Sequence, residues 1–232
     1  MPINGRYIAA ALFILSGISA RAGQAAPLIL TTDDTPPLNF MNEQTHEVSG
    51  FVTDIIRKTM AKAGVDYKIE LLPWTRAYKM ALEESGTCVY STGQTDDRMP
   101  LFKWVAPLTT NSWVLFGAPN STLSIKSLDD VKQLKVGGYP GGKATYLESH
   151  GVTVDAAPRD ELNIAKLLAG RIDLWATSEA SGAELTKRQG VDNLKKLFVF
   201  KEVVIGLACN KDVSDETIIK LNTALKVVNS EK

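Results

Sequence analysis

The sequence has 232 residues, and its 26 basic and 26 acidic side chains give a formal net charge of zero at pH 7. This balance lacks the basic excess that is typical of proteins that bind nucleic acid or an anionic membrane surface. Hydrophobic residues make up 44% of the chain, which is enough for a buried core.

The first 25 residues have the pattern of a secretory signal peptide. Arg6 gives a basic start, residues 8–18 are apolar, and small residues follow up to Ala25. The apolar run is shorter than the roughly 20 residues that a membrane-spanning helix needs. We expect cleavage after Ala25, or alternatively after Ala22, and a secreted protein of one or two domains.

The first half of the secreted chain alternates predicted strands and helices. Asp33 to Pro37 form a loop, because paired prolines exclude a helix and a central strand. The expected elements are strand 28–32, helix 51–63, strand 67–72, helix 73–84 and a strand that begins at Cys88. This alternation predicts a parallel sheet with crossover helices.

The second half repeats the alternation and predicts a second α/β unit with its own sheet. The expected elements are strand 111–117, a short helix from Ser127, strand 135–139, helix 144–150, strand 152–156, helix 161–169, strand 172–177, helix 181–188, strands 197–200 and 203–209, and helix 214–228. The chain would cross between the units near residues 109–112 and again near 201–204. Two lobes joined by two strands suit hinge closure on a ligand.

The segment from Cys88 to Pro107 is the strongest candidate for a binding site. Its predicted strand breaks into small polar residues at 91–95, which leaves backbone groups open to a ligand. Arg98 follows, and a guanidinium suits a carboxylate or a phosphate. The alternative is a surface ion pair between Arg98 and the Asp96–Asp97 pair.

The residues as a whole resemble the type II periplasmic solute-binding proteins of amino-acid ABC importers, the bacterial extracellular solute-binding family 3. The resemblance spans residues 27–230 and depends on the order of several short motifs. These are PLNF at 37–40, GFVTD at 50–54, the strand and TxxR segment that ends at Arg98, WVAP at 104–107, SLDD at 127–130, GRID at 170–173, and the segment from Asn210 to Leu225.

The resemblance implies an α/β fold with two lobes, each with a parallel-rich sheet, joined by a two-strand hinge. Lobe 1 would comprise residues 26–110 and 204–232, and lobe 2 residues 111–203. It implies a monomer in the periplasm that passes a small solute to an inner-membrane ABC permease. Members usually continue past the last helix, so we expect a less covered lobe 1 or a truncated chain.

Site residues follow from the resemblance position by position. Arg98 matches the arginine that binds a ligand carboxylate, and Ser91 and Gly93 match positions that offer backbone and hydroxyl groups. The loop before the helix of lobe 2, with Gly141, Gly142 and Lys143, matches a carboxylate site at a helix N-terminus. Three further residues lie beside the predicted cleft, with core packing or a solvated helix face as alternatives: Trp74, Arg76 and Tyr90.

One departure from the family bears on the ligand. Amino-acid binders place an acid for the ligand ammonium where this chain has Ser178, with Glu179 next to it. A hydroxyl cannot replace a carboxylate in that role. The role would pass to Glu179 or to Asp33 or Asp34, or the ligand is not a standard α-amino acid. Lys143 either indicates a more acidic ligand or is simply solvated.

The two cysteines, Cys88 and Cys209, could form a disulfide in an oxidising compartment or remain as buried thiols. The resemblance favours the disulfide, because it places Cys209 on a returning strand next to the strand of Cys88.

Two other functions compete with solute delivery. The same fold hosts periplasmic dehydratases of cyclohexadienyl substrates, for which Glu179 is the one candidate acid. The sequence shows no Ser/His/Asp or metal-ligand constellation, so we expect no enzyme, metal or cofactor. A sensory module that docks on a partner when it is loaded is the third hypothesis.

Overall fold

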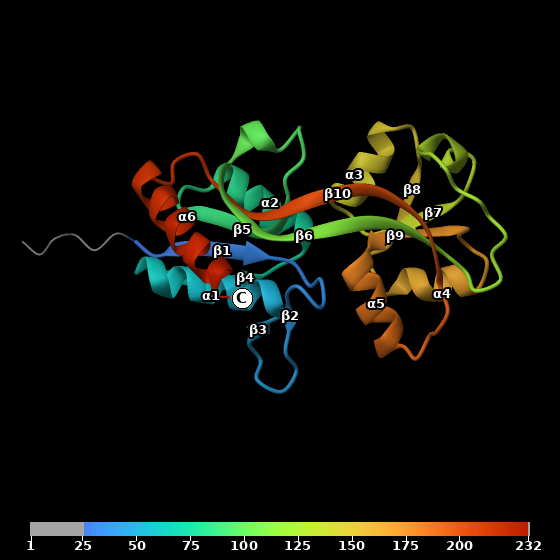
Figure 1. Ribbon diagram of the computed structural model, residues 1–232, viewed down its shortest axis with the longest axis horizontal. Helices are drawn as coiled ribbons and strands as arrows, with labels where there is room; N and C mark the ends of the chain where they lie inside the picture. The colour runs from blue at the N-terminus through green and yellow to red at the C-terminus, as the bar shows by residue number, and fades with distance from the viewer. Residues whose placement is uncertain (1–25, 232) are drawn as a thin grey trace, which may run out of the picture.

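The computed structural model describes residues 26–231, so the predicted signal peptide lies outside the described residues. Among residues 26–231, no helix is both long and apolar enough to cross a membrane. The ribbon has two lobes, with two long strands running between them (Figure 1).

The first lobe follows the predicted alternation closely. It contains β1 (Leu28–Thr32), α1 (Phe51–Ala63), β4 (Tyr67–Leu71), α2 (Trp74–Glu83) and β5 (Thr87–Gly93), and the three strands are parallel. A small hairpin of β2 (Phe40–Met41) and β3 (Val48–Ser49) lies outside this sheet. In α1, the apolar side chains of Val52, Ile56 and Met60 are fully buried, which explains the helical spacing in the sequence.

The second lobe contains β7 (Val136–Gly138), α3 (Gly142–Ser149), β8 (Val154–Ala156), α4 (Leu162–Leu168), β9 (Leu174–Ser178) and α5 (Glu179–Arg188). Here β7 pairs in parallel with both β8 and β9. The short helix predicted from Ser127 is a 3₁₀ turn, η2 (Leu128–Val131), with a capping box between Ser127 and Asp130.

Two strands of 15 residues each, β6 (Lys103–Gly117) and β10 (Lys195–Cys209), join the lobes. They pair antiparallel from Lys195 opposite Gly117 to Cys209 opposite Lys103. The separate strands predicted at 197–200 and 203–209 are therefore one strand, and the predicted strand 111–117 is the second half of β6. A 3₁₀ turn, η1 (Met99–Leu101), precedes β6, and α6 (Asp215–Ser230) ends the described chain.

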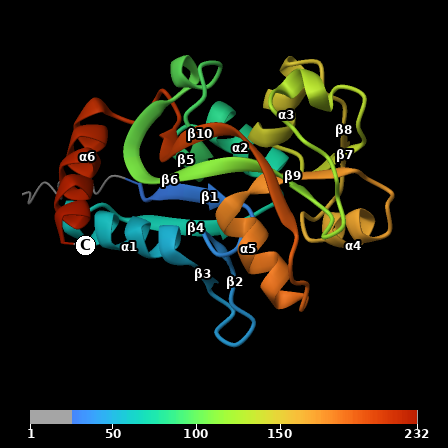
Figure 2. The ribbon, with the colours of Figure 1, turned by 45° about the vertical axis from the view of Figure 1, so that its right-hand side comes forward.

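The two parallel parts thus belong to one hydrogen-bonded sheet of eight strands, in the order β4-β1-β5-β10-β6-β9-β7-β8. The long strands close the gap between the predicted sheets, because β10 pairs with β5 on one side and β6 pairs with β9 on the other. In Figure 2, α1 and α6 lie on the first lobe, while α3, α4 and α5 surround the second.

The predicted disulfide between Cys88 and Cys209 is confirmed in the structure. The two cysteines are directly opposite each other on β5 and β10, and both are fully buried in the core of the first lobe. The bond links segments 121 residues apart, so it closes a long loop that the unfolded chain would otherwise sample freely.

We expect the mature protein, denatured without a reductant, to show no reaction with a thiol reagent, and to react at two thiols after reduction. Replacing both cysteines by alanine should lower the free energy of unfolding by about 2–5 kcal/mol in urea denaturation. Free thiols in the unreduced protein would contradict the cross-link.

Candidate functional site

A cavity lies between the lobes and is lined by residues of both. The carboxyl ends of parallel strands in the two lobes open toward the same space, which is where ligands bind in α/β folds. Eight of the predicted site residues line this cavity: Trp74, Ser91, Gly93, Arg98, Gly141, Gly142, Lys143 and Ser178. Other lining residues include Asp33, Thr35, Leu38, Asn111, Trp113, Tyr139 and Pro140.

Arg98 is a buried cation whose charge is stabilised by the Tyr78 hydroxyl and by the nearby charge of Asp97. Its side chain is only 6% exposed, and the guanidinium carbon lies 5.1 Å from the ring centre of Trp74 and 5.2 Å from that of Tyr78. No carboxylate of residues 26–231 forms an ion pair with it. Burial lowers the pKa of Arg98, since the charged form loses its hydration. A buried guanidinium of this kind favours binding of an anion.

The N-terminus of α3 faces the same guanidinium. Helix α3 begins at Gly142, after Gly141 with a φ of 144° that a larger side chain would rarely adopt. A Cβ atom at Gly142 would lie 2.9 Å from Nη1 of Arg98 and 3.1 Å from the ring of Trp113. Free amide groups of a helix N-terminus attract anions, so a guanidinium and a helix N-terminus converge on one space.

Ser91 lines the cavity and is held in place by a hydrogen bond to Asn39. Ser91 has a φ of 57°, which is uncommon for a residue other than glycine, and it donates a hydrogen bond to Oδ1 of Asn39. The side-chain amide of Asn39, which is fully buried, donates to the backbone carbonyl of Asp33. These contacts hold the end of β5 and the loop after β1 in a fixed arrangement.

Two carboxylates approach the cavity near Lys143. Asp33 follows β1 and is 6% exposed, and burial raises its pKa while the charge of Lys143 opposes that rise. Asp160 lies in the loop between β8 and α4. Burial raises its pKa too, and the charge of Lys143 again opposes the rise. Burial, together with the negative charges of Asp33 and Asp160, raises the pKa of Tyr139 to about 12.

Four of the predicted site residues do not line this cavity. Tyr90 is fully buried in the first-lobe core, where its hydroxyl lies 3.1 Å from that of Thr53, so the packing alternative describes it. Arg76 is exposed on α2. Glu179 forms an ion pair of 2.6 Å with Lys196 on the outer side of α5. Asp34 lines a second, adjoining cavity instead.

Ser178 reaches the cavity, but its hydroxyl is already engaged. It caps α5 by accepting a hydrogen bond of 3.1 Å from the backbone N–H of Ser181, and it donates one of 2.8 Å to the Ser181 hydroxyl. The residue is 1% exposed.

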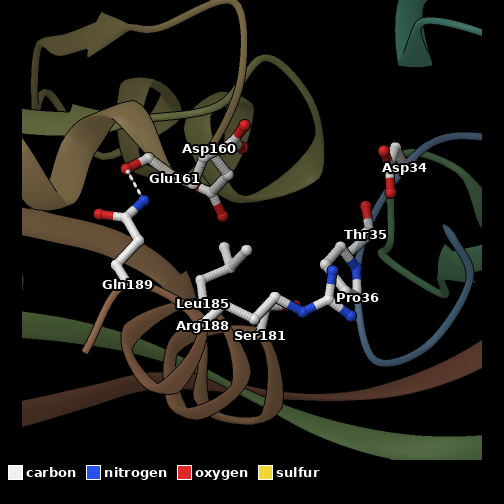
Figure 3. A pocket seen from close by; sticks show the side chains of 9 residues that line it. All are labelled: Asp34, Thr35, Pro36, Asp160, Glu161, Ser181, Leu185, Arg188 and Gln189. Carbon is white, nitrogen blue, oxygen red and sulfur yellow. Dashed lines mark hydrogen bonds between the residues drawn. The ribbon is translucent and has the colours of Figure 1, made fainter. Parts of the chain in front are cut away.

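The adjoining cavity lies between the loop after β1 and helices α4 and α5 (Figure 3). Asp34 and Asp160 approach it from the two lobes, and the Arg188 side chain extends toward Pro36. Arg188 also stacks 5.0 Å from the ring centre of Phe40, so a second-lobe cation contacts the first lobe.

Reasoning from the sequence missed Asp160, Tyr139, Trp113 and Asn39. Tyr139 and Asp160 both follow strands of the second lobe. Because ligands bind at the carboxyl ends of strands in α/β folds, their positions in the sequence could have identified them. Trp113 lies in the middle of a long strand, and no local signal marks it.

Comparison with known proteins agrees with this geometry. The model of the bacterial extracellular solute-binding proteins, family 3, matches residues 28–231. The chain therefore belongs to family 3 of the bacterial extracellular solute-binding proteins. A search of curated proteins finds no match.

Several solved structures share the fold. A histidine kinase sensor domain with similarity to periplasmic binding proteins has a TM-score of 0.81 at 16% identity, covering 90% of this chain and 92% of its own. The arginine-, lysine-, histidine-binding protein ArtJ from Geobacillus stearothermophilus has a TM-score of 0.76 at 20% identity, covering 89% and 90%. An ancestral arginine-binding protein bound to glutamine has a TM-score of 0.74 at 23% identity, covering 88% and 92%.

The raised pKa of Asp33 predicts a pH dependence of stability. The folded protein holds the Asp33 proton more tightly than the unfolded chain, so this group favours folding below its ordinary pKa of 3.8, and the advantage is lost as pH rises through the folded pKa. The free energy of unfolding of the unliganded wild type should therefore fall, relative to Asp33→Asn, as pH rises from about 4 to 8. A difference in unfolding free energy between wild type and Asp33→Asn that stays constant across this pH range, measured by urea denaturation, would refute this prediction.

Proposed function

We propose that this family-3 protein captures a small carboxylate-bearing solute, an amino acid or a related acid, between its lobes and delivers it to an inner-membrane ABC permease. The observation that carries the proposal is that the buried Arg98, which forms no ion pair among residues 26–231, faces the N-terminus of α3. We further propose that the protein acts in the periplasm as a monomer and does not transform its ligand.

A carboxylate would satisfy both groups at once. Arg98 comes from the first lobe and Gly142 from the second, and the guanidinium can donate two parallel hydrogen bonds to one carboxylate. Backbone amides at the start of α3 would complete its coordination. Without a ligand, two centres of positive potential face each other, so an anion between them removes a repulsion as well as adding attraction.

The same arrangement supports closure on the ligand. We propose residues 26–110 and 204–232 as one moving lobe and residues 111–203 as the other, with β6 and β10 bending between them. A ligand that contacts both lobes binds the closed form more tightly than the open form and so shifts the population toward closure. Contacts between the lobes, such as the hydrogen bond of 3.4 Å from the Trp74 backbone N–H to the Tyr139 hydroxyl, would form on closing.

Support for a transport role also comes from the relatives. Family 3 consists mainly of binding proteins, and structures with the same fold include proteins described as binding arginine, lysine and histidine. The two histidines lie on exposed segments, His46 near the β2–β3 hairpin and His150 at the end of α3, and neither lines the central cavity.

We expect Arg98→Ala to abolish solute binding with little loss of stability. The mature protein, residues 26–232, would be screened by thermal shift against amino acids, polyamines, dicarboxylates and prephenate-like acids. A ligand at a hundredfold excess over its Kd stabilises the folded state by about 2.7 kcal/mol. The hit would then be titrated into wild type and variant, and recovered to verify that it is unchanged.

Arg76→Ala is the matched control, because it removes an exposed arginine of the same lobe. It should leave affinity unchanged. Equal affinity of the Arg98 variant and wild type would overturn the proposed site, and a chemically altered solute would favour the enzyme hypothesis.

A further inference from the structure

We infer that Asp160 supplies the carboxylate that binds a positively charged group of the solute, a role which rests on the function proposed above. The residue reaches the end of β9 from the loop between β8 and α4, so the acid at this end of the cleft comes from a different element than α5 or β9.

The residues at the start of α5 cannot fill this role. The Ser178 hydroxyl both accepts from and donates to Ser181, so its hydrogen-bonding capacity is largely used within the helix cap. Glu179, the next acid along the chain, is ion-paired with Lys196 away from the central cavity.

Asp160 is held over the end of β9 by side chains of that strand. Trp175 donates its indole N–H to Oδ1 at 2.8 Å, and Thr177 donates its hydroxyl to Oδ2 at 2.6 Å. The Asn163 amide adds a longer contact of 3.4 Å to Oδ1. Three donors favour the ionised carboxylate and fix its orientation, yet two carboxylate oxygens can accept about four hydrogen bonds. Acceptor capacity therefore remains for a ligand.

The open side of Asp160 faces the cleft. Asp160 lines the adjoining cavity opposite Asp34, as Figure 3 shows. Its charge also acts on Lys143 and Tyr139, which both line the central cavity. Asp160 thus lines the adjoining cavity and is close enough to interact with charged and polar groups of the central one.

The charges of the cleft are unbalanced in a way that a ligand with both signs would correct. Asp33 and Asp160 are both opposed by one cation, Lys143, whereas Arg98 forms no ion pair among the described residues and feels only the nearby charge of Asp97. At the rim, Arg159 pairs with Glu161 at 3.2 Å and Arg188 with Glu184 at 2.7 Å. With Asp34 on the adjoining cavity as well, acids outnumber cations at this end of the cleft, while the Arg98 guanidinium lies apart from them. A solute with a carboxylate and an ammonium group would pair both.

The experiment compares solutes that differ only in the ammonium group. L-alanine and L-lactate, L-aspartate and L-malate, L-phenylalanine and L-phenyllactate, and L-arginine and its 2-hydroxy analogue would be titrated by calorimetry into wild type and Asp160→Asn. Asparagine keeps the size of aspartate and can still accept from Trp175. For the pair that binds, wild type should prefer the amino acid by at least about 30-fold. The variant should lose most of this preference through weaker amino-acid binding.

Two further variants separate recognition from folding. Glu179→Gln removes the neighbouring acid and should leave the preference unchanged. Lys143→Met removes the cation that competes for Asp160 without touching the bonds to Trp175 and Thr177. It should raise the preference for the amino acid. If Asp160→Asn does not fold, the preference measured for Lys143→Met tests the role of Asp160 instead.

The outcomes distinguish this inference from the proposed function. If binding depends on Arg98 but wild type binds 2-hydroxy acids and amino acids with equal affinity, the role of Asp160 is overturned and the carboxylate site stands. An undiminished preference in Asp160→Asn, or an unchanged preference in Lys143→Met, also overturns it. If no member of either series binds wild type, the inference fails together with the proposed function for these solutes.

Discussion

The pairing of β6 with β10 is the constraint on which the rest of the structure depends. Both strands pass through both lobes, and their hydrogen bonds continue from Lys195 opposite Gly117 to Cys209 opposite Lys103. Because of this ladder, β5 and β9 lie on opposite sides of the same two strands, and the loops that follow them approach one cleft. The disulfide covalently ties the far end of β10 to β5, so the strand pair is held firmly in the first lobe.

Within this frame the cleft keeps opposite charges apart. Arg98 packs against Trp74 and Tyr78 and faces the start of α3, while Asp33 and Asp160 lie near Lys143. Burying a charge without a partner costs stability, and sites that bind ligands commonly carry such costs. In the proposed function, this separation makes the cleft complementary to a small polar solute, because the binding groups are oriented before the solute arrives.

Much of the fold was predictable because its signals are local. The apolar spacing of α1, the glycine after it and the polar end of β5 each depend on a few consecutive residues, and the motif around Arg98 placed that side chain in the cleft. Asp160 was missed because its partners, Trp175 and Thr177, are brought to it only by the packing of α4 against β9. Glu179 does not line the central cavity for a related reason: the first turn of α5 directs it toward Lys196 on β10. The continuity of β6 was hidden by Pro107, which removes a backbone donor, although the strand passes through it where the register against β10 shifts.

The central claim, that the cleft closes on a carboxylate held by Arg98, can be tested on the protein as the cell makes it. The wild type and Arg98→Ala would be exported to the periplasm, purified without dialysis, and analysed by native mass spectrometry with identification of any released solute. We predict that a small carboxylic acid accompanies the wild type and is absent from the variant. A solute that lacks a carboxylate, or the same solute bound equally to both proteins, would contradict the claim.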